Sequence, residues 1–283
     1  MDRRRVEEAV MKGLMKAATL LIVGVLGLIM LTILVRGIRA MSWSMLTQTP
    51  KGGFYLGREG GILNAIVGSF YIAGGATGLA FAAAVPVVLY LNVFCRRGSR
   101  TAAVIRFLLD VLWGVPSIVF GAFGFLLMLA VGLRASLLGG ILTVSLFVLP
   151  ILCRAMDEVV RMIPTDLLES SYALGATRLQ TAVRVVLRQA SAGILTAVLI
   201  AFGRGVGDAA SVLFTAGYSD QIPQSLTRPA ATLPLAIFFQ LGTPFPQVQD
   251  RAYAAALILT VVVLATSLLS RRLGRRLTRH SIS

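Results

Sequence analysis

Two opposite charges, Arg204 and Asp208, stand four residues apart in the apolar stretch IAFGRGVGDAASVLFTAG (200–217). If this stretch is helical, that spacing puts both side chains on one face, where they can neutralise each other. An ionisable residue near the centre of a membrane span costs about 2.5–3.5 kcal/mol on insertion scales. A guanidinium can hold two oxygens of an oxyanion at once. The pattern predicts either an anion site on a transport pathway, with Asp208 orienting or releasing Arg204, or a salt bridge that only fixes helix packing.

Three glycines, Gly203, Gly205 and Gly207, alternate around these charges. Small residues let helices approach closely, and a local unwinding exposes backbone N–H groups to an anion. Both effects can hold together. A nucleotide-binding loop would need a preceding strand, and the sequence predicts none.

Ser117 follows a proline within the apolar segment LWGVPSIVFG (112–121). Because proline lacks a backbone N–H, it removes a helical hydrogen bond and bends a span. The bend either serves packing alone or lines a pathway, with the Ser117 hydroxyl near the ion.

A polar segment, ESSYALGATRLQTAVRVVLRQA (169–190), separates two apolar runs. Together with the residues just before it, this segment predicts a short helix. The helix begins with Thr165 as N-cap and ends at Gly175, because glycine suits the left-handed residue of a helix end. Thr177 and Gln180 then have the spacing of a capping box that starts a second helix. The segment is predicted to be a helical elbow outside the membrane; the alternative is an ordinary amphipathic loop.

The composition is that of a membrane protein. Hydrophobic residues make up 57% of the 283-residue chain, charged residues 14%, and the mean hydropathy is +0.83, whereas soluble domains carry roughly a quarter charged residues. This excludes an ordinary soluble enzyme. Six apolar runs are long enough to cross a bilayer, which takes about 20 helical residues. They are predicted at 17–35, 62–91, 107–133, 135–151, 192–216 and 253–269. Continuous runs of this kind indicate helices instead of barrel strands.

Basic residues indicate the orientation. Nineteen of the 27 Lys and Arg residues lie in 1–16, 96–106, 154–188 and 271–279, and by the positive-inside rule these segments and both termini are cytoplasmic. The net charge of +15 is therefore mostly topological, and no nucleic-acid partner is predicted. The first run is interpreted as a retained span and not as a cleaved signal peptide.

Catalytic and metal-binding patterns are absent from the sequence. The single histidine, His280, lies in the polar tail, and the two cysteines, Cys95 and Cys153, lie near predicted cytoplasmic span ends. There is no G-x-x-x-x-G-K-[ST] loop for ATP. Energy for transport must therefore come from another chain or from an ion gradient.

Several segments resemble known transport proteins. Glu169, Gly175, Val185 and Leu187 match the spacing of the coupling motif of ABC importer permeases, E-A-A, three residues, G, nine residues, I-x-L-P. Ser170 and Ser171 replace its alanines, and Arg188 replaces its proline. The segments 203–210 and 112–121 resemble the G-R-A-[IL]-G-E-T/A and V-P-S-I-V-x-G segments of phosphate-importer permeases of the PstA and PstC type. The segments 217–226 and 231–237 are more similar to the PstA type.

The resemblance implies an all-α membrane protein with six transmembrane helices, the type I ABC importer permease fold and both termini cytoplasmic. Residues 1–61 would form the cytoplasmic N-terminus, first span and outer loop. Residues 62–270 would form the permease core, with a cytoplasmic coupling loop at 154–190 and an outer loop at 217–251. Residues 271–283 would form a basic cytoplasmic tail. The chain would lie in the bacterial inner membrane and would not itself be an enzyme.

The resemblance also implies function, partners and site residues. The chain would import inorganic phosphate by alternating access with a PstC-like permease, a PstB-like ATPase dimer and a PstS-like extracellular phosphate-binding protein. It would bind no cofactor, because ATP and Mg are used by the ATPase. The substrate pathway would include Arg204, Asp208, Gly205, Gly207 and Ser117, and the ATPase would couple through Glu169, Ser170, Ser171, Leu174 and Gly175.

Three alternatives remain at this point. The substrate could be another oxyanion, such as molybdate, tungstate or sulfate. The chain could be a secondary transporter or channel driven by a gradient. It could also be a membrane scaffold or sensor subunit that transports nothing.

Overall fold

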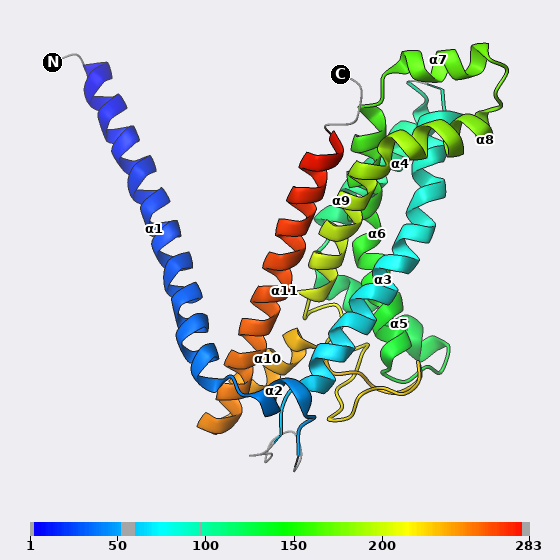
Figure 1. The fold of residues 1–283 in the computed structure, drawn as a ribbon. Coiled ribbons are helices and arrows are strands. Elements are labelled where there is room, and N and C mark those ends of the chain that lie inside the picture. Colours follow the sequence, from blue (N-terminus) through cyan, green and yellow to red (C-terminus); the bar gives the residue numbers. More distant parts are fainter. Residues whose placement is uncertain (1–2, 52–59, 97, 279–283) are drawn as a thin grey trace.

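The computed structural model describes residues 3–51, 60–96 and 98–278, and helices dominate them (Figure 1). The α-helices are α1 (Arg3–Ala40), α2 (Trp43–Thr47), α3 (Leu63–Leu89), α4 (Arg100–Gly114), α5 (Ser117–Ala130), α6 (Leu137–Arg161), α7 (Thr165–Ala173), α8 (Arg178–Gln180), α9 (Leu187–Val206), α10 (Leu233–Leu241) and α11 (Pro246–Thr278). Two π-helical segments, η1 (Tyr90–Phe94) and η2 (Thr181–Val186), extend α3 and join α8 to α9.

Five stretches of the described chain are helical, long and apolar enough to cross a membrane: Glu7–Ala40, Leu63–Phe94, Leu137–Arg161, Arg178–Val206 and Pro246–Gly274. The pair α4 and α5 forms a sixth if the two are counted as one broken span, since they meet at a bend of 99°. The six predicted apolar runs thus fall on helices, and two of them differ in detail from the prediction.

The third predicted run, 107–133, is not one helix. α4 ends at Gly114 and α5 begins at Ser117. Val115 has extended backbone angles, φ −72° and ψ 129°, because a following proline disfavours the helical region. Pro116 also cannot donate the next helical hydrogen bond. The predicted bend is therefore a complete break.

The fifth predicted run, 192–216, is helical only as far as Val206, where α9 ends. The residues that follow form turns up to Ala216. The prediction of a continuous helix through this run was wrong. The clustered glycines explain the difference, because each lowers helix stability by about 1 kcal/mol relative to alanine.

The core lies between α3 and α6, the most extensive helix pair. On α3 the buried positions are mostly small residues three or four apart, including Ala73, Ala76, Ala80 and Ala84. On α6 they are larger, including Val144, Val148 and Leu152, which are fully buried. Small residues on one helix let the backbones approach, so the larger side chains of the other fill the space between them.

α1 stands away from the bundle for most of its length (Figure 1). It touches α11 near its C-terminal end, where Gly37 lies against Leu257. There Arg36 Nη1 donates a hydrogen bond to the Tyr253 hydroxyl at 3.1 Å. The remaining apolar surface of α1 is exposed, so in a membrane it faces lipid or another subunit.

The two ends of the bundle differ. The start of α1, the end of α11 and the elbow around α7 lie at one end, and α2 and α10 lie at the other (Figure 1). α10 lies inside the predicted outer loop 217–251 and is packed into the bundle. Thr232 caps it by accepting a hydrogen bond from the Leu235 amide, and the Leu233 amide donates to Ser69 Oγ at 2.8 Å.

Candidate transport and coupling sites

The predicted elbow is present at the end of the bundle. α7 ends in a left-handed residue, Gly175, with φ +80°. The Ala176 amide donates to the Ser171 carbonyl at 3.1 Å, and the Gly175 amide donates to the Tyr172 carbonyl at 2.9 Å. These two bonds form a Schellman motif, which satisfies carbonyls that the helix end leaves free. The predicted role of Gly175 in ending the helix is confirmed.

The second helix of the elbow starts as predicted. Thr177 Oγ1 accepts from the Gln180 amide at 3.3 Å, and Gln180 Oε1 accepts from the Thr177 amide at 2.9 Å. The predicted capping box is therefore confirmed. The predicted N-cap at Thr165 is wrong: Pro164 occupies that position and Thr165 is the first helical residue. The Thr165 hydroxyl lies against Asp166 instead of capping the helix.

The outer face of the elbow is exposed, while its inner face is attached to the bundle. Glu169, Ser170 and Gly175 are exposed, and the Leu174 side chain is 89% exposed although it is apolar. Ser171 differs from its neighbours, because its hydroxyl lies 2.9 Å from the Thr181 hydroxyl of η2. Leu168 packs against the main core. The exposed face is thus connected to η2 and to the core through short contacts.

The elbow continues directly into the fifth span. α8, η2 and α9 form one helical stretch from Arg178 to Val206, with a π-helical turn in place of a proline kink. A wide turn of this kind changes the direction of the following side chains. Arg178 also donates from Nη1 to the Phe94 carbonyl at 3.2 Å, which joins the elbow to the end of the second span.

Arg204 lies in the last turn of α9 and its side chain is exposed. Its guanidinium carbon lies over the Phe147 ring of α6, 5.4 Å from the ring centroid. Cation–π contact of this kind holds the side chain in place while leaving its N–H groups available. The guanidinium is thus exposed at the end of an apolar helix, and no acidic side chain among the described residues pairs with it.

Asp208 does not pair with Arg204. The helix ends at Val206, so the two side chains do not share a helical face, and no ion pair joins them in the described part of the chain. Asp208 Oδ2 instead accepts a hydrogen bond from the Ser211 amide at 2.8 Å. The predicted neutralising pair was wrong, because the carboxylate stabilises the turn after the helix.

The glycines around Arg204 combine close packing with unwinding. Gly205 is buried, and an added Cβ would lie 3.3 Å from Val144 Cγ1 of α6. Gly207 is exposed and ends the helix as its C-cap. Close helix packing therefore belongs to Gly205, and the unwinding of the helix belongs to Gly207.

Ser117 is the first residue of α5 and is half-buried. One turn later, Gly121 packs against the turn that follows Arg204, since an added Cβ there would lie 2.7 Å from the Ala210 carbonyl oxygen. The break in the third span and the end of the fifth are thus neighbours. Among the described residues, no hydrogen bond joins Ser117 to Arg204.

A buried charged network was missed from the sequence. Asp157 is fully buried, and Arg106 reaches it with Nε at 2.8 Å and Nη2 at 3.1 Å. Asn92 Nδ2 also donates to Asp157 at 2.7 Å. Nearby, Arg154 Nε lies 2.7 Å from Asp110, within ion-pair distance but without hydrogen-bond geometry. In the sequence, Arg106 and Arg154 were counted only among the basic residues of predicted cytoplasmic segments, and the other members were given no role. Only the packing of three helical segments brings these residues together.

Within the described residues, no group of three His, Cys, Asp or Glu side chains could hold a metal ion. Cys95 and Cys153 are free thiols. His280 lies outside the described residues.

Comparisons with known proteins identify the family. Residues 84–279 match the family model described as "Binding-protein-dependent transport system inner membrane component". The chain is 34% identical over 244 residues to the phosphate transport system permease protein PstA of Haemophilus influenzae, covering 86% of this chain and 85% of that one. It is 37% identical over 221 residues to PstA of Xylella fastidiosa, covering 76% and 75% of the two chains.

Two solved structures are similar in fold. The inward-facing MetNI methionine ABC transporter matches with a TM-score of 0.59 at 20% identity, covering 76% of this chain and 95% of that chain. A bacterial alginate ABC transporter in complex with a pentasaccharide-bound periplasmic protein matches with a TM-score of 0.62 at 17% identity, covering 98% and 100%. The predicted type I ABC importer permease fold is therefore confirmed. With the family model matching most of its length, and its apolar helices arranged as in these transporters, the chain belongs to the inner membrane components of binding-protein-dependent transport systems.

Proposed function

We propose that this chain is the permease subunit of an ATP-driven importer of inorganic phosphate. The observation that carries the proposal is the 34% identity to a phosphate transport permease along 86% of this chain and 85% of that relative. The chain itself is a transport subunit and not an enzyme, so its side chains bind and release an ion without changing it.

The proposed substrate contact is Arg204. Its guanidinium is exposed at the end of α9 and is held by the Phe147 ring, with no acidic partner in the described chain. A tetrahedral oxyanion that passes this position receives two N–H donors from a planar fork. Gly207, exposed at the helix end, would let the backbone come close to the ion, and Gly205 would hold α9 against α6 beside it. Ser117 and Asp208 would lie on neighbouring segments that border the pathway.

The proposed force-transmitting element is the exposed face of the elbow. Glu169, Ser170, Leu174 and Gly175 would dock into a groove of a PstB-like ATPase, and an apolar side chain that is 89% exposed suits such burial. Ser171 would act one step further in, through its contact with Thr181. ATP and Mg would be bound by that ATPase. When the ATPase dimer closes, the elbow would move η2 and α9, and with them Arg204.

The remaining partners complete the transporter. A PstC-like permease would pair with this chain to enclose the pathway, and a PstS-like protein would deliver phosphate from outside. The elbow lies at the same end of the bundle as the start of α1 and the end of α11 (Figure 1), and the segments 1–16, 154–188 and 271–279 hold most of the Lys and Arg residues. The positive-inside rule then assigns this end and both termini to the cytoplasm.

Uptake of radiolabelled phosphate into vesicles that contain the assembled transporter tests the function. We expect uptake to require ATP at the cytoplasmic side and to persist after an ionophore collapses ion gradients. Excess unlabelled phosphate should compete, whereas molybdate, tungstate and sulfate should not.

Two other results would replace the proposal. Uptake that requires an ion gradient and does not require ATP indicates a secondary transporter. Competition by molybdate, tungstate or sulfate that equals competition by phosphate indicates a permease for another oxyanion.

A further inference from the structure

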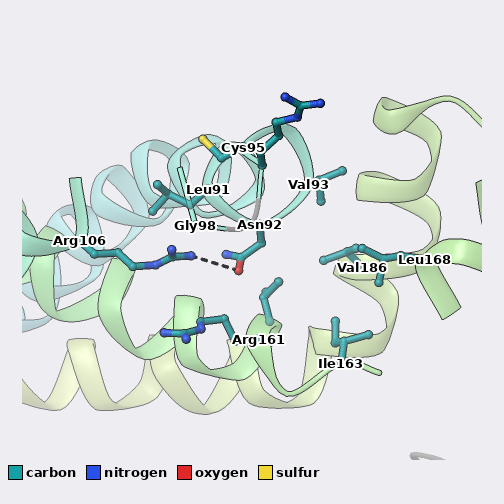
Figure 2. Close-up of a pocket in the computed structure, with 12 residues that line it drawn as sticks. Leu91, Asn92, Val93, Cys95, Gly98, Arg106, Arg161, Ile163, Leu168 and Val186 are labelled. Carbon is teal, nitrogen blue, oxygen red and sulfur yellow. Dashed lines mark hydrogen bonds between the residues drawn. The ribbon is translucent and has the colours of Figure 1, made fainter. Parts of the chain in front are cut away.

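A pocket of about 410 Å³ lies at the elbow end of the bundle, away from Arg204. Its lining comes from the end of the second span, the start of α4, the end of α6, the elbow and η2 (Figure 2). This volume falls in the range of roughly 300–1,000 Å³ that is typical of small-molecule sites. Nothing in the proposed transport cycle uses it.

The polar part of the lining is positively charged. Among the described residues, three arginines, Arg96, Arg106 and Arg161, line the pocket and no acidic side chain does. The carboxylate of Asp157, which contacts the lining residue Arg106, is held by it at 2.8 and 3.1 Å. Arg96 and Arg161 make no ion pair with the described residues. The charge of Arg106 is therefore balanced by Asp157, and the excess positive charge of the pocket comes from Arg96 and Arg161.

The arginines are placed for a compact anion. Asn92 Oδ1 accepts from Arg106 Nη2 at 3.4 Å, which fixes the direction of that guanidinium. Arg161 lies below Arg106 on the same side of the pocket (Figure 2). Arg106 donates from Nε and Nη2 to Asp157 and Asn92, which leaves its Nη1 for an occupant. A group with several charged oxygens could accept hydrogen bonds from this atom and from Arg161.

The opposite wall belongs to the coupling element. Leu168 of α7 and Val186 of η2 face the arginines across the pocket (Figure 2). Leu168 packs on the core, and Val186 is buried. An occupant of the pocket thus touches the elbow on its inner side, whereas an ATPase would touch the outer side.

We propose that this pocket binds a phosphate group through Arg161 and Arg106, and that its occupancy restrains the elbow. The group comes either from free inorganic phosphate or from the headgroup of an anionic phospholipid, since both present the same oxygens to the guanidinium groups. The proposal goes beyond the proposed function and does not depend on which ion the pathway carries.

Cys95 reports on occupancy, because its half-buried thiol lines the pocket whereas Cys153 is buried elsewhere in the core. The assembled transporter is placed in phosphatidylcholine nanodiscs, and alkylation of Cys95 by N-ethylmaleimide is followed by mass spectrometry. One arm adds inorganic phosphate, with chloride at equal ionic strength as control; the other replaces part of the lipid with phosphatidylglycerol. All variants carry Arg204→Gln, so that phosphate bound on the transport pathway does not affect labelling. A Cys95→Ser variant, which should not be labelled, verifies that Cys95 is the alkylated residue.

At a free phosphate concentration about ten times Kd, occupancy reaches about 90%, so labelling should slow about ten-fold. Protection should be lost in Arg161→Gln and kept in Arg271→Gln, which removes an exposed arginine outside the pocket. Protection by phosphate alone identifies the free ion, and protection by phosphatidylglycerol alone identifies the lipid.

Three results would overturn the site: no protection in either arm, protection that survives Arg161→Gln, or a Cys95 that does not react in phosphatidylcholine alone. None of them bears on phosphate uptake, which is measured separately.

Discussion

At the scale of single residues, Asp157 places a carboxylate in the interior of the bundle. Its side chain is fully buried, and removing a carboxylate from water costs several kcal/mol unless strong partners compensate. Arg106 and Asn92 supply three short hydrogen bonds to it. They come from η1 and α4, so the carboxylate of α6 ties three segments together at the elbow end.

Replacing Asp157 by Asn removes the negative charge and leaves Arg106 without its ion-pair partner. Breaking a buried pair costs about 3–5 kcal/mol, and we expect the lower end, because the Arg106 side chain is 23% exposed. Thermal unfolding of the purified complex should show a clear fall in Tm. The matched control is Asp110→Asn. The Asp110 side chain, which pairs with Arg154, is 48% exposed, so losing this pair should cost less than about 1 kcal/mol. Equal shifts for the two variants would contradict this ranking.

At the scale of elements, the elbow depends on one backbone angle. Gly175 has φ +80° and no atom within contact distance of an added Cβ. A substitution there is therefore opposed by backbone strain and not by crowding. Asparagine tolerates this left-handed region far better than a β-branched residue does.

Gly175→Val should loosen the corner between α7 and α8 and weaken the link between ATP hydrolysis and uptake. A left-handed non-glycine residue costs about 1–3 kcal/mol, enough to shift the corner while the spans remain folded. We expect several-fold less phosphate taken up per ATP hydrolysed, measured on the same vesicles. Gly175→Asn should retain most of the coupling. A valine variant that couples as well as the native chain would show that this corner does not transmit force.

Local signals in the sequence predicted the elbow well and the helix boundaries less well. Gly175, Thr177 and Gln180 act on neighbours within four residues, so their spacing alone was sufficient. Thr165 was predicted to be the N-cap, but Pro164, whose φ is fixed, takes that position and Thr165 is the first helical residue. The end of α9 at Val206 depended on how several glycines combine with the Asp208 side chain, and apolar composition alone suggested a longer helix.

At the scale of the whole molecule, the chain has the surface of a subunit of a larger transporter. Most of the surface of α1 is apolar and exposed, and Arg204 is exposed as well. Both features are expected of a subunit whose remaining contacts come from lipid and a second permease. Hydropathy predicted the order of the apolar spans, because bilayer thickness fixes their length; the described chain has five, or six if the bent pair α4 and α5 counts as one. It could not predict the network of Asn92, Arg106 and Asp157, since that network exists only after three helices pack.

The most direct test of the central proposal is phosphate uptake by an Arg204→Gln transporter, beside Arg272→Gln, which removes an exposed arginine from the far end of α11. Glutamine keeps the size and polarity of the side chain but loses the charge. We expect uptake to fall at least about a hundred-fold, since losing a charged hydrogen-bonding partner costs roughly 3 kcal/mol, while assembly with the ATPase and uptake by the Arg272 variant stay normal. Normal phosphate uptake by the Arg204 variant would contradict the placing of this guanidinium on the transport pathway.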